Sequence, residues 1–177
     1  MQADISAIFV IVPEAEPLVG PLRAKYDPAA SVGVPAHITA LVPFMPRDRL
    51  TDAVLKRVRS ALHEVAPFSF KLERVARFSQ TTYLAPEPPE PFVAITAALM
   101  REFPDYPLYG GRFSEIIPHL TVADQDEKFA GIAERELADR LERYGGVRAN
   151  CSVIEIYENA MDGYWRRFES FDLGTHR

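Results

Sequence analysis

The alternation of apolar and polar residues divides the chain into short strands and amphipathic helices. Strands are predicted at 6–12, 35–44, 68–79, 81–87, 117–124, 147–158 and 163–174. Apolar residues at helical spacing predict helices at 16–26, 48–65 and 127–144, and a further helix that carries Phe92, Ile95, Leu99 and Phe103. Gly20 and Pro21 weaken the first of these helices, whereas Gly145 and Gly146 end the helix at 127–144.

Residues 86–91, with the sequence PEPPEP, allow two interpretations. A proline-rich segment can link two domains, but prolines and glutamates also suit the first turn of a helix. We favour the start of the helix that contains Phe92, which keeps the chain in a single domain.

Two of the predicted strands share an arrangement of polar residues. The segments PAHITALVPF (35–44) and IPHLTVAD (117–124) both place proline, histidine, an aliphatic residue and threonine in that order. Side chains alternate across a strand, so His37, Thr39 and Leu41 are expected on one face. The opposite face would hold Ala36, Ile38, Ala40 and Val42, and in the second strand Pro118, Leu120 and Val122. Because the apolar face would pack on helices, both histidine–threonine pairs are expected to point toward a cleft.

The two halves of the chain also share an order of elements. Each has a strand ending in Pro-Glu, a helix, a His-x-Thr strand, an amphipathic helix and one or more further strands. This order predicts the α+β class: two pseudo-symmetric lobes, each a mostly antiparallel sheet with outer helices, around a central cleft. We expect a single bilobal domain over 1–177, with lobes roughly at 1–79 and 80–177 and an exchange of terminal strands left open.

Composition narrows the classes of partner. With 177 residues, 47% of them hydrophobic, the chain can bury a sizeable core. Its net charge of −5 argues against a long track of nucleic-acid phosphates, and no DNA partner is expected. The single Cys151 is interpreted as a strand residue in a reducing compartment. No segment suits a signal or a membrane span and no coiled-coil heptads are present, so we expect a soluble, cytoplasmic monomer with no membrane partner.

Two facing histidines would suit displacement at phosphorus. An imidazole with an ordinary pKa near 6.5 can accept or donate a proton at neutral pH, and threonine hydroxyls can donate to phosphate oxygens. This chemistry requires no metal. One His-x-Thr sequence is weak evidence, since most strand histidines are structural, but the second copy favours a shared role. The other two histidines are controls: His63 lies off its helix stripe, and His176 belongs to the terminal tail.

The two motifs, with support from TTYLAPEPPEPF (81–92) and WRRFESFDLG (165–174), resemble the two-histidine (2H) phosphoesterase superfamily, in particular its bacterial 2'-5' RNA ligase-like members. The resemblance covers essentially the whole chain. It implies a bilobal fold and a hydrolase, acting without metal or cofactor on 2',3'-cyclic phosphates or 2'-5' linkages. Matched to the family's motifs, His37 and His119 correspond to the acid/base pair. Thr39 and Thr121 correspond to the residues that bind phosphate. The negative net charge of the chain favours a small nucleotide or an RNA end as substrate.

Three further residues are candidates for substrate contact. Tyr83 could stack on a base or bond a phosphate, although packing is an equal interpretation. Arg112 precedes the second motif in a glycine-rich loop and could clamp phosphate or be merely exposed. Trp165 could offer an aromatic platform, or simply close the terminal strand.

Two other functions compete with the phosphoesterase interpretation. A protein that binds nucleotide or RNA phosphate ends without turnover would need the same face, although Arg or Lys would serve a binder equally well. A metal site formed by His37, His119 and Asp124 is the other alternative, but Asp124 is expected on the opposite strand face from Thr121.

Overall fold

The computed structural model describes residues 4–174. His176 lies outside the described residues. In chain order the strands are β1 (Ser6–Ile11), β2 (His37–Phe44), β3 (Phe68–Arg77), β4 (Thr81–Glu87), β5 (Leu120–Asp124), β6 (Val147–Cys151), β7 (Val153–Asn159) and β8 (Trp165–Asp172). The α-helices are α1 (Glu16–Tyr26), α2 (Pro28–Ser31), α3 (Asp52–Leu62), α4 (Glu90–Glu102) and α5 (Glu127–Tyr144), and the 3-10 turns are η1 (Pro13–Ala15), η2 (Arg47–Arg49) and η3 (Leu108–Gly111).

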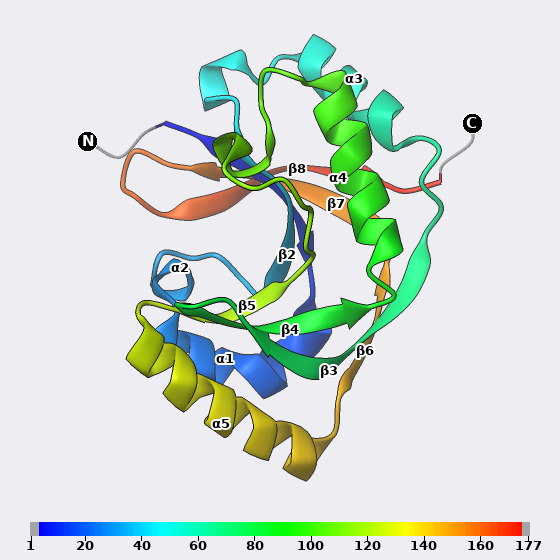
Figure 1. Cartoon of the computed structure of the whole chain (residues 1–177). Coiled ribbons are helices and arrows are strands. Elements are labelled where there is room, and N and C mark those ends of the chain that lie inside the picture. The colour runs from blue at the N-terminus through cyan, green and yellow to red at the C-terminus, as the bar shows by residue number, and fades with distance from the viewer. Residues whose placement is uncertain (1–3, 175–177) are drawn as a thin grey trace.

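The strands form one curled, eight-stranded sheet in the order β6-β3-β4-β5-β2-β1-β7-β8. Neighbouring strands in the described part of the chain pair antiparallel. The predicted α+β class with antiparallel strands and outer helices is confirmed, but the two expected sheets are joined because β2 pairs with β5 at the centre (Figure 1). Each half of the sheet takes strands from both segments 1–79 and 80–177: β3 lies beside β4, whereas β7 lies beside β1.

The helices are distributed across the halves in the same way. α1 contacts β5 and α5 under one half of the sheet, although it comes from the beginning of the chain. α4, from the middle of the chain, contacts β2 and α3 over the other half (Figure 1). Neither half therefore has a core made from one contiguous segment. Within residues 4–174, no helix is both long enough and apolar enough to cross a bilayer.

Local sequence explains most of the helix ends. The Asp126 side chain caps α5 by accepting a hydrogen bond of 2.8 Å from the Phe129 backbone, and Gly145 ends the helix with a positive φ of 79°. Glu90 and Pro91 occupy the first turn of α4, so the helix interpretation of PEPPEP is confirmed. The short α2, which the hydrophobic pattern does not predict, starts where the Asp27 side chain accepts from the Ala29 backbone.

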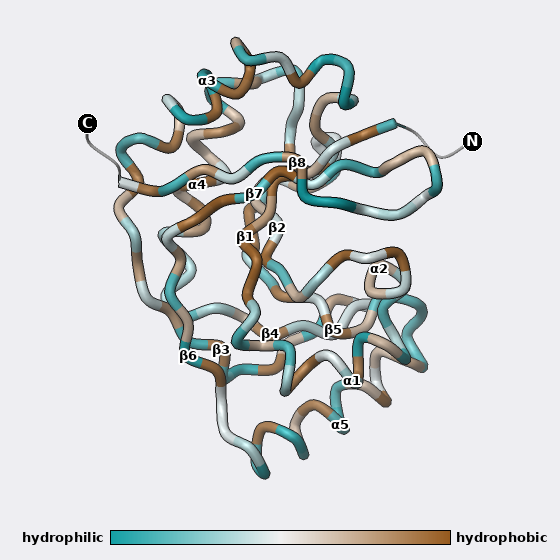
Figure 2. The backbone as a smooth tube through the Cα atoms, turned by 180° about the vertical axis from the view of Figure 1, so that it is seen from behind, coloured by the Kyte–Doolittle hydropathy of each residue, from teal (hydrophilic) through white to brown (hydrophobic). Residues whose placement is uncertain are grey.

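The strand predicted at 147–158 is two strands with a break at Ser152. The residues before the break pair with β3 at one edge of the sheet, and those after it pair with β1 in the other half. The residues of β1 are hydrophobic along most of the strand (Figure 2), as expected for a strand buried inside the sheet. Cys151, next to the break, is buried, and burial raises the pKa of its thiol to about 12. A thiol in that environment stays protonated and unreactive at neutral pH, in agreement with its interpretation as a strand residue.

A bulge in β2 changes which side chains share a face. Phe9 pairs with Thr39 and Ile8 with Leu41, so Ala40 has no partner of its own. Leu41 consequently lies in the main core, and Val42 packs on the opposite side against the cluster that contains Phe9. The sequence predicted Leu41 on the same face as His37 and Val42 on the opposite face, and both predictions are therefore wrong. The buried Thr96 hydroxyl of α4 donates to the Ala40 carbonyl at 2.8 Å.

Replacing Thr96 with valine keeps the side-chain shape and leaves the Ala40 carbonyl without its donor. We expect Thr96→Val to lower the free energy of unfolding by about 1–3 kcal/mol, measured by urea denaturation. Thr81→Val is the control, since its hydroxyl bonds the exposed Asp124 carboxylate at 2.9 Å. Equal losses in the two variants would show that the bulge does not depend on this buried hydrogen bond.

Candidate active site

Both motifs lie on one face at the centre of the sheet, which we call the motif face: the side of β2 and β5 that carries His37, Thr39, His119 and Thr121. The pairing of Ile38 with Leu120 fixes their register. Counting outward from this pair, His37 lies across from Thr121, and Thr39 across from His119. Ile38 and Leu120 are buried in the core on the other face, so the predicted alternation of polar and apolar faces holds here. The two histidines belong to one continuous sheet, with His37 at the start of β2 and His119 just before β5, rather than to facing walls.

The two imidazoles are held in the same way. Nδ1 of His37 lies 2.8 Å from the Pro35 carbonyl oxygen, and Nδ1 of His119 lies 2.7 Å from that of Ile117. A carbonyl oxygen can only accept, so each Nδ1 carries the hydrogen and donates it. The neutral rings therefore leave Nε2 with a free lone pair. In both motifs, the carbonyl two residues before the histidine selects the same tautomer.

Burial lowers the pKa of both histidines below the ordinary 6.5. The pKa of His37 falls to about 3, chiefly because of burial, and the charges of Arg23 and His119 lower it further. The pKa of His119 is also lowered by burial, while the negative charge of Asp124 works in the opposite direction. Both rings are thus neutral at pH 7 in the free protein. One histidine has a cation as its charged neighbour and the other an anion, so the two are electrostatically distinct.

Aromatic rings flank each histidine at pseudo-equivalent positions. Phe9 pairs with Thr39 across β1 and β2, and its ring centroid lies 4.2 Å from that of His37. Tyr83 pairs with Thr121 across β4 and β5, and its ring lies 5.4 Å from His119. Phe78, which is 37% exposed, approaches His119 edge-on at 5.3 Å. These rings exclude water from one side of each imidazole, which is a structural source of the lowered pKa values.

The structure brings two of the three additional candidates close to the motifs. Tyr83 contacts His119 directly and is almost fully buried. Trp165 lies 6.2 Å from Phe9, one ring removed from His37, in the cluster that also contains Ala7 and Val34. Arg112 is exposed in the loop before β5. A direct contact between these three residues and a substrate remains a prediction.

Sequence reasoning did not select Tyr109, which the structure places between the two motifs. Its side chain forms a hydrogen bond with Thr39, and its ring stacks on His119 with a centroid distance of 6.3 Å and an interplanar angle of 28°. The available signal was the sequence Tyr-Gly-Gly just before the second motif, since paired glycines mark a sharp turn near it. Phe9 was also not selected, because the apolar run of its strand gives it no distinguishing pattern.

The alternative metal site would need Asp124 as a third ligand beside His37 and His119. Asp124 stands at the end of β5 and accepts a hydrogen bond of 2.9 Å from the Thr81 hydroxyl. Within residues 4–174, His, Cys, Asp and Glu side chains do not gather in threes in a way that would hold an ion.

The two histidines on the motif face, each with a threonine two residues on, are the residues that carry the resemblance to the two-histidine phosphoesterases. Comparison of the sequence with family models agrees, since the model of the 2'-5' RNA ligase superfamily matches residues 11–160. The chain belongs to this superfamily, and the resemblance noted in its two motifs is confirmed. Membership and fold together support a phosphoesterase or 2'-5' RNA ligase-like activity.

Individual relatives extend over nearly the whole chain. A Bacillus cytotoxicus protein, provisionally named a phosphoesterase, is 26% identical over 166 residues, which cover 86% of this chain and 87% of that protein. A Bacillus licheniformis protein with a similar name is 22% identical and covers 86% and 88% of the two chains.

Solved structures show the same fold at lower identity. TT0787 of Thermus thermophilus aligns with a TM-score of 0.65 at 16% identity, over 98% of this chain and 100% of its own. E. coli LigT complexed with 3'-AMP aligns with a TM-score of 0.58 at 13% identity, over 97% and 98% of the two chains.

The lowered pKa of His37 makes folding sensitive to acid. Between pH 6.5 and about 3 the unfolded imidazole binds a proton that the folded one does not, so stability falls as the pH decreases through this range. His37→Asn removes the titrating group, and its amide can still donate to the Pro35 carbonyl. We expect urea unfolding at pH 6.5 and 4.5 to show a smaller loss of stability for this variant than for the wild type. An identical loss would contradict the lowered pKa.

Proposed function

We propose that this protein is a metal-independent phosphoesterase that opens a 2',3'-cyclic phosphate on a nucleotide or RNA end, or cleaves a 2'-5' linkage, with His37 and His119 as its acid/base pair. The observation that carries the proposal is the matched tautomer of the two histidines. Both leave Nε2 without a proton, and each histidine shares the motif face with a threonine two residues on. This is the pair of proton-transfer groups that displacement at phosphorus needs.

The reaction follows from these positions. One histidine accepts a proton from water through Nε2 as the water oxygen bonds to phosphorus. The bond from phosphorus to one ribose oxygen then breaks, and the other histidine, as imidazolium, donates its Nε2 proton to that leaving oxygen. Thr39 and Thr121 donate hydrogen bonds to the non-bridging phosphate oxygens, where negative charge gathers in the transition state.

The charged neighbours suggest which histidine has which role. Burial, with a smaller effect of the Arg23 charge, lowers the pKa of His37 and keeps it neutral, as a general base requires. Burial lowers the pKa of His119, but the negative charge of Asp124 opposes this effect, and an anionic phosphodiester would add to that opposition and favour the protonated form that a general acid requires. We therefore assign His37 as the base and His119 as the acid.

The class of substrate is inferred from charge and from the relatives. E. coli LigT, which shares the fold, has been crystallised with 3'-AMP and with phosphate. The net charge of −5 on this chain supports a small nucleotide or the end of an RNA rather than a long RNA track. We propose that the protein acts as a monomer in the reducing environment of the cytoplasm, where a buried free thiol such as Cys151 is common.

Purified protein incubated in chelator with each of the four 2',3'-cyclic nucleoside monophosphates should convert at least one of them to a monophosphate, followed by chromatography. His37→Asn and His119→Asn retain the bond to the backbone carbonyl and should each lower kcat by roughly 10²- to 10⁴-fold. The control is His63→Asn, because His63 is exposed at the end of α3. Binding of the nucleotides by the wild type without turnover would instead support the non-catalytic alternative.

A substrate with a good leaving group distinguishes the acid from the base. The p-nitrophenolate leaving group needs no proton, so bis(p-nitrophenyl) phosphate bypasses the general acid. We expect His119→Asn to lose much less activity on this diester than on the cyclic nucleotide, whereas His37→Asn should lose a similar factor on both. The reverse pattern would exchange the two assignments.

A further inference from the structure

The loop between α4 and β5 contains an unusual backbone conformation. Tyr109 has φ 52° and ψ 32°, and among residues 4–174 it is the one non-glycine residue with positive φ. Gly110 and Gly111 follow with φ of 65° and 76°. Glycine adopts this left-handed region without a penalty, but a bulky aromatic residue does not. A conformation of this kind persists only where surrounding contacts hold it, and such residues are frequent in functional sites.

The contacts that hold Tyr109 come from both motifs. On one side its hydroxyl and the side chain of Thr39 form a hydrogen bond. On the other its ring lies 6.3 Å from that of His119 and nearly parallel to it, and Phe113 covers the edge of the tyrosine ring at 5.8 Å. The neighbouring Leu108 is buried and anchors the loop in the core. The left-handed turn therefore directs one side chain onto Thr39 of β2 and onto His119, the residue just before β5.

We propose that Tyr109 is a positioning residue of the active site, whose hydroxyl orients the hydroxyl of Thr39 and whose ring holds the imidazole of His119 in place. Its catalytic consequence rests on the function proposed above. The contacts themselves do not depend on the identity of the substrate.

The effect on Thr39 follows from how hydroxyl groups bond. The β-branched side chain fixes Oγ1, but the hydroxyl hydrogen can still rotate. Between two hydroxyls either oxygen can accept, and a bond from Thr39 to the Tyr109 oxygen lowers the pKa of the phenol, against the larger effect of burial. A bound phosphate oxygen would accept the Thr39 hydrogen instead, and Tyr109 would then donate to the free lone pair of Oγ1 and hold the Thr39 hydroxyl in that orientation. Burial raises the pKa of the Tyr109 phenol, so this donor keeps its proton throughout the neutral range.

The hydroxyl role is tested by a double-mutant cycle on turnover of the cyclic nucleotide. Tyr109→Phe keeps the ring and should lower kcat/KM by about tenfold, the scale of one hydrogen bond. In a Thr39→Val background the same change should have almost no further effect, because its target hydroxyl is gone. Tyr106→Phe is the matched control: Tyr106 lies just before the same turn but packs on Phe44 at 5.4 Å. Independent, multiplicative losses at Tyr109 and Thr39 would overturn this role.

The ring role is tested without a substrate. In Tyr109→Leu the imidazole of His119 loses its stacked neighbour, so its pKa, measured by NMR titration, should rise toward 6.5, whereas Tyr109→Phe should leave it unchanged. An unchanged value in Tyr109→Leu would overturn the role of the ring. A wild type that turns over neither the cyclic nucleotides nor a 2'-5'-linked dinucleotide would contradict the proposed function, while this titration would still decide whether Tyr109 encloses His119.

Discussion

The contact between β2 and β5 is the constraint on which the site depends. These two strands join the halves of the sheet through one paired position, Ile38 opposite Leu120. Both residues are buried, so the core fixes their register, and a shift by one residue would turn a histidine and its threonine into the core. Apolar packing on one face thereby determines which polar groups meet on the other. The helices that stabilise this centre, α1 and α4, contact β5 and β2 respectively.

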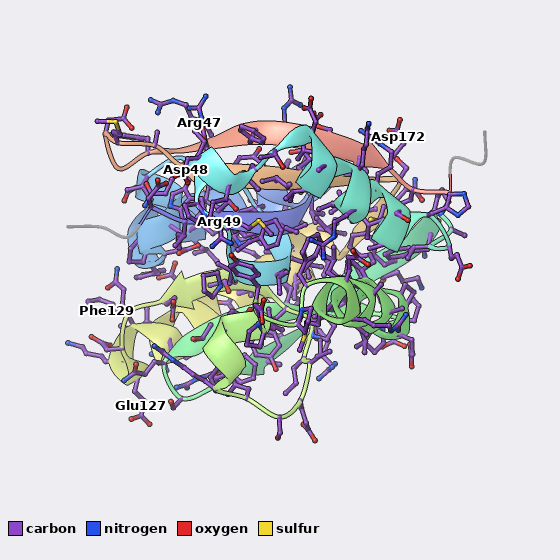
Figure 3. All side chains as sticks on the ribbon, turned by 90° about the horizontal axis from the view of Figure 1, so that it is seen from above. Arg47, Asp48, Arg49, Glu127, Phe129 and Asp172 are labelled. Atoms are coloured by element: carbon purple, nitrogen blue, oxygen red, sulfur yellow. The ribbon has the colours of Figure 1, made fainter. Side chains whose placement is uncertain are left out.

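The same apolar surroundings that fix the histidines also alter their chemistry. Rings such as Phe9 and Tyr83 remove water from the imidazoles, which favours their neutral form. A histidine that acts as a base needs this neutral form. A histidine that acts as an acid must first bind a proton, and its apolar surroundings disfavour the protonated form. A bound phosphodiester would supply the missing negative charge, so protonation of the acid would be coupled to substrate binding. Figure 3 labels charged residues of η2 (Arg47, Asp48 and Arg49) over one half of the sheet and Glu127, at the start of α5, over the other.

Local patterns in the sequence predicted the parts of the structure that depend on local chemistry. The 3.6-residue period identified α1 and α5 with correct bounds, and alternation placed His37 with Thr39 and His119 with Thr121 on polar faces. The errors at Leu41 and Ser152 have a different origin, because a bulge and a change of sheet edge are set by the partner strands. Tyr109 was missed for the same reason. Its contacts with Thr39 and His119 bridge residues 70 and 10 positions away in the numbering, and a left-handed tyrosine has no periodic signature.

The exchange of elements between the halves bears on how the protein is made in the cell. β1 is synthesised first, yet one of its two neighbours is β7, which follows it by more than a hundred residues. A chain still emerging from the ribosome can therefore form helices and the β3–β4 hairpin, but it cannot complete the sheet around His37. On the function proposed here, activity would arise only after β7 has been synthesised and has left the ribosome, so shorter partial products would be inactive.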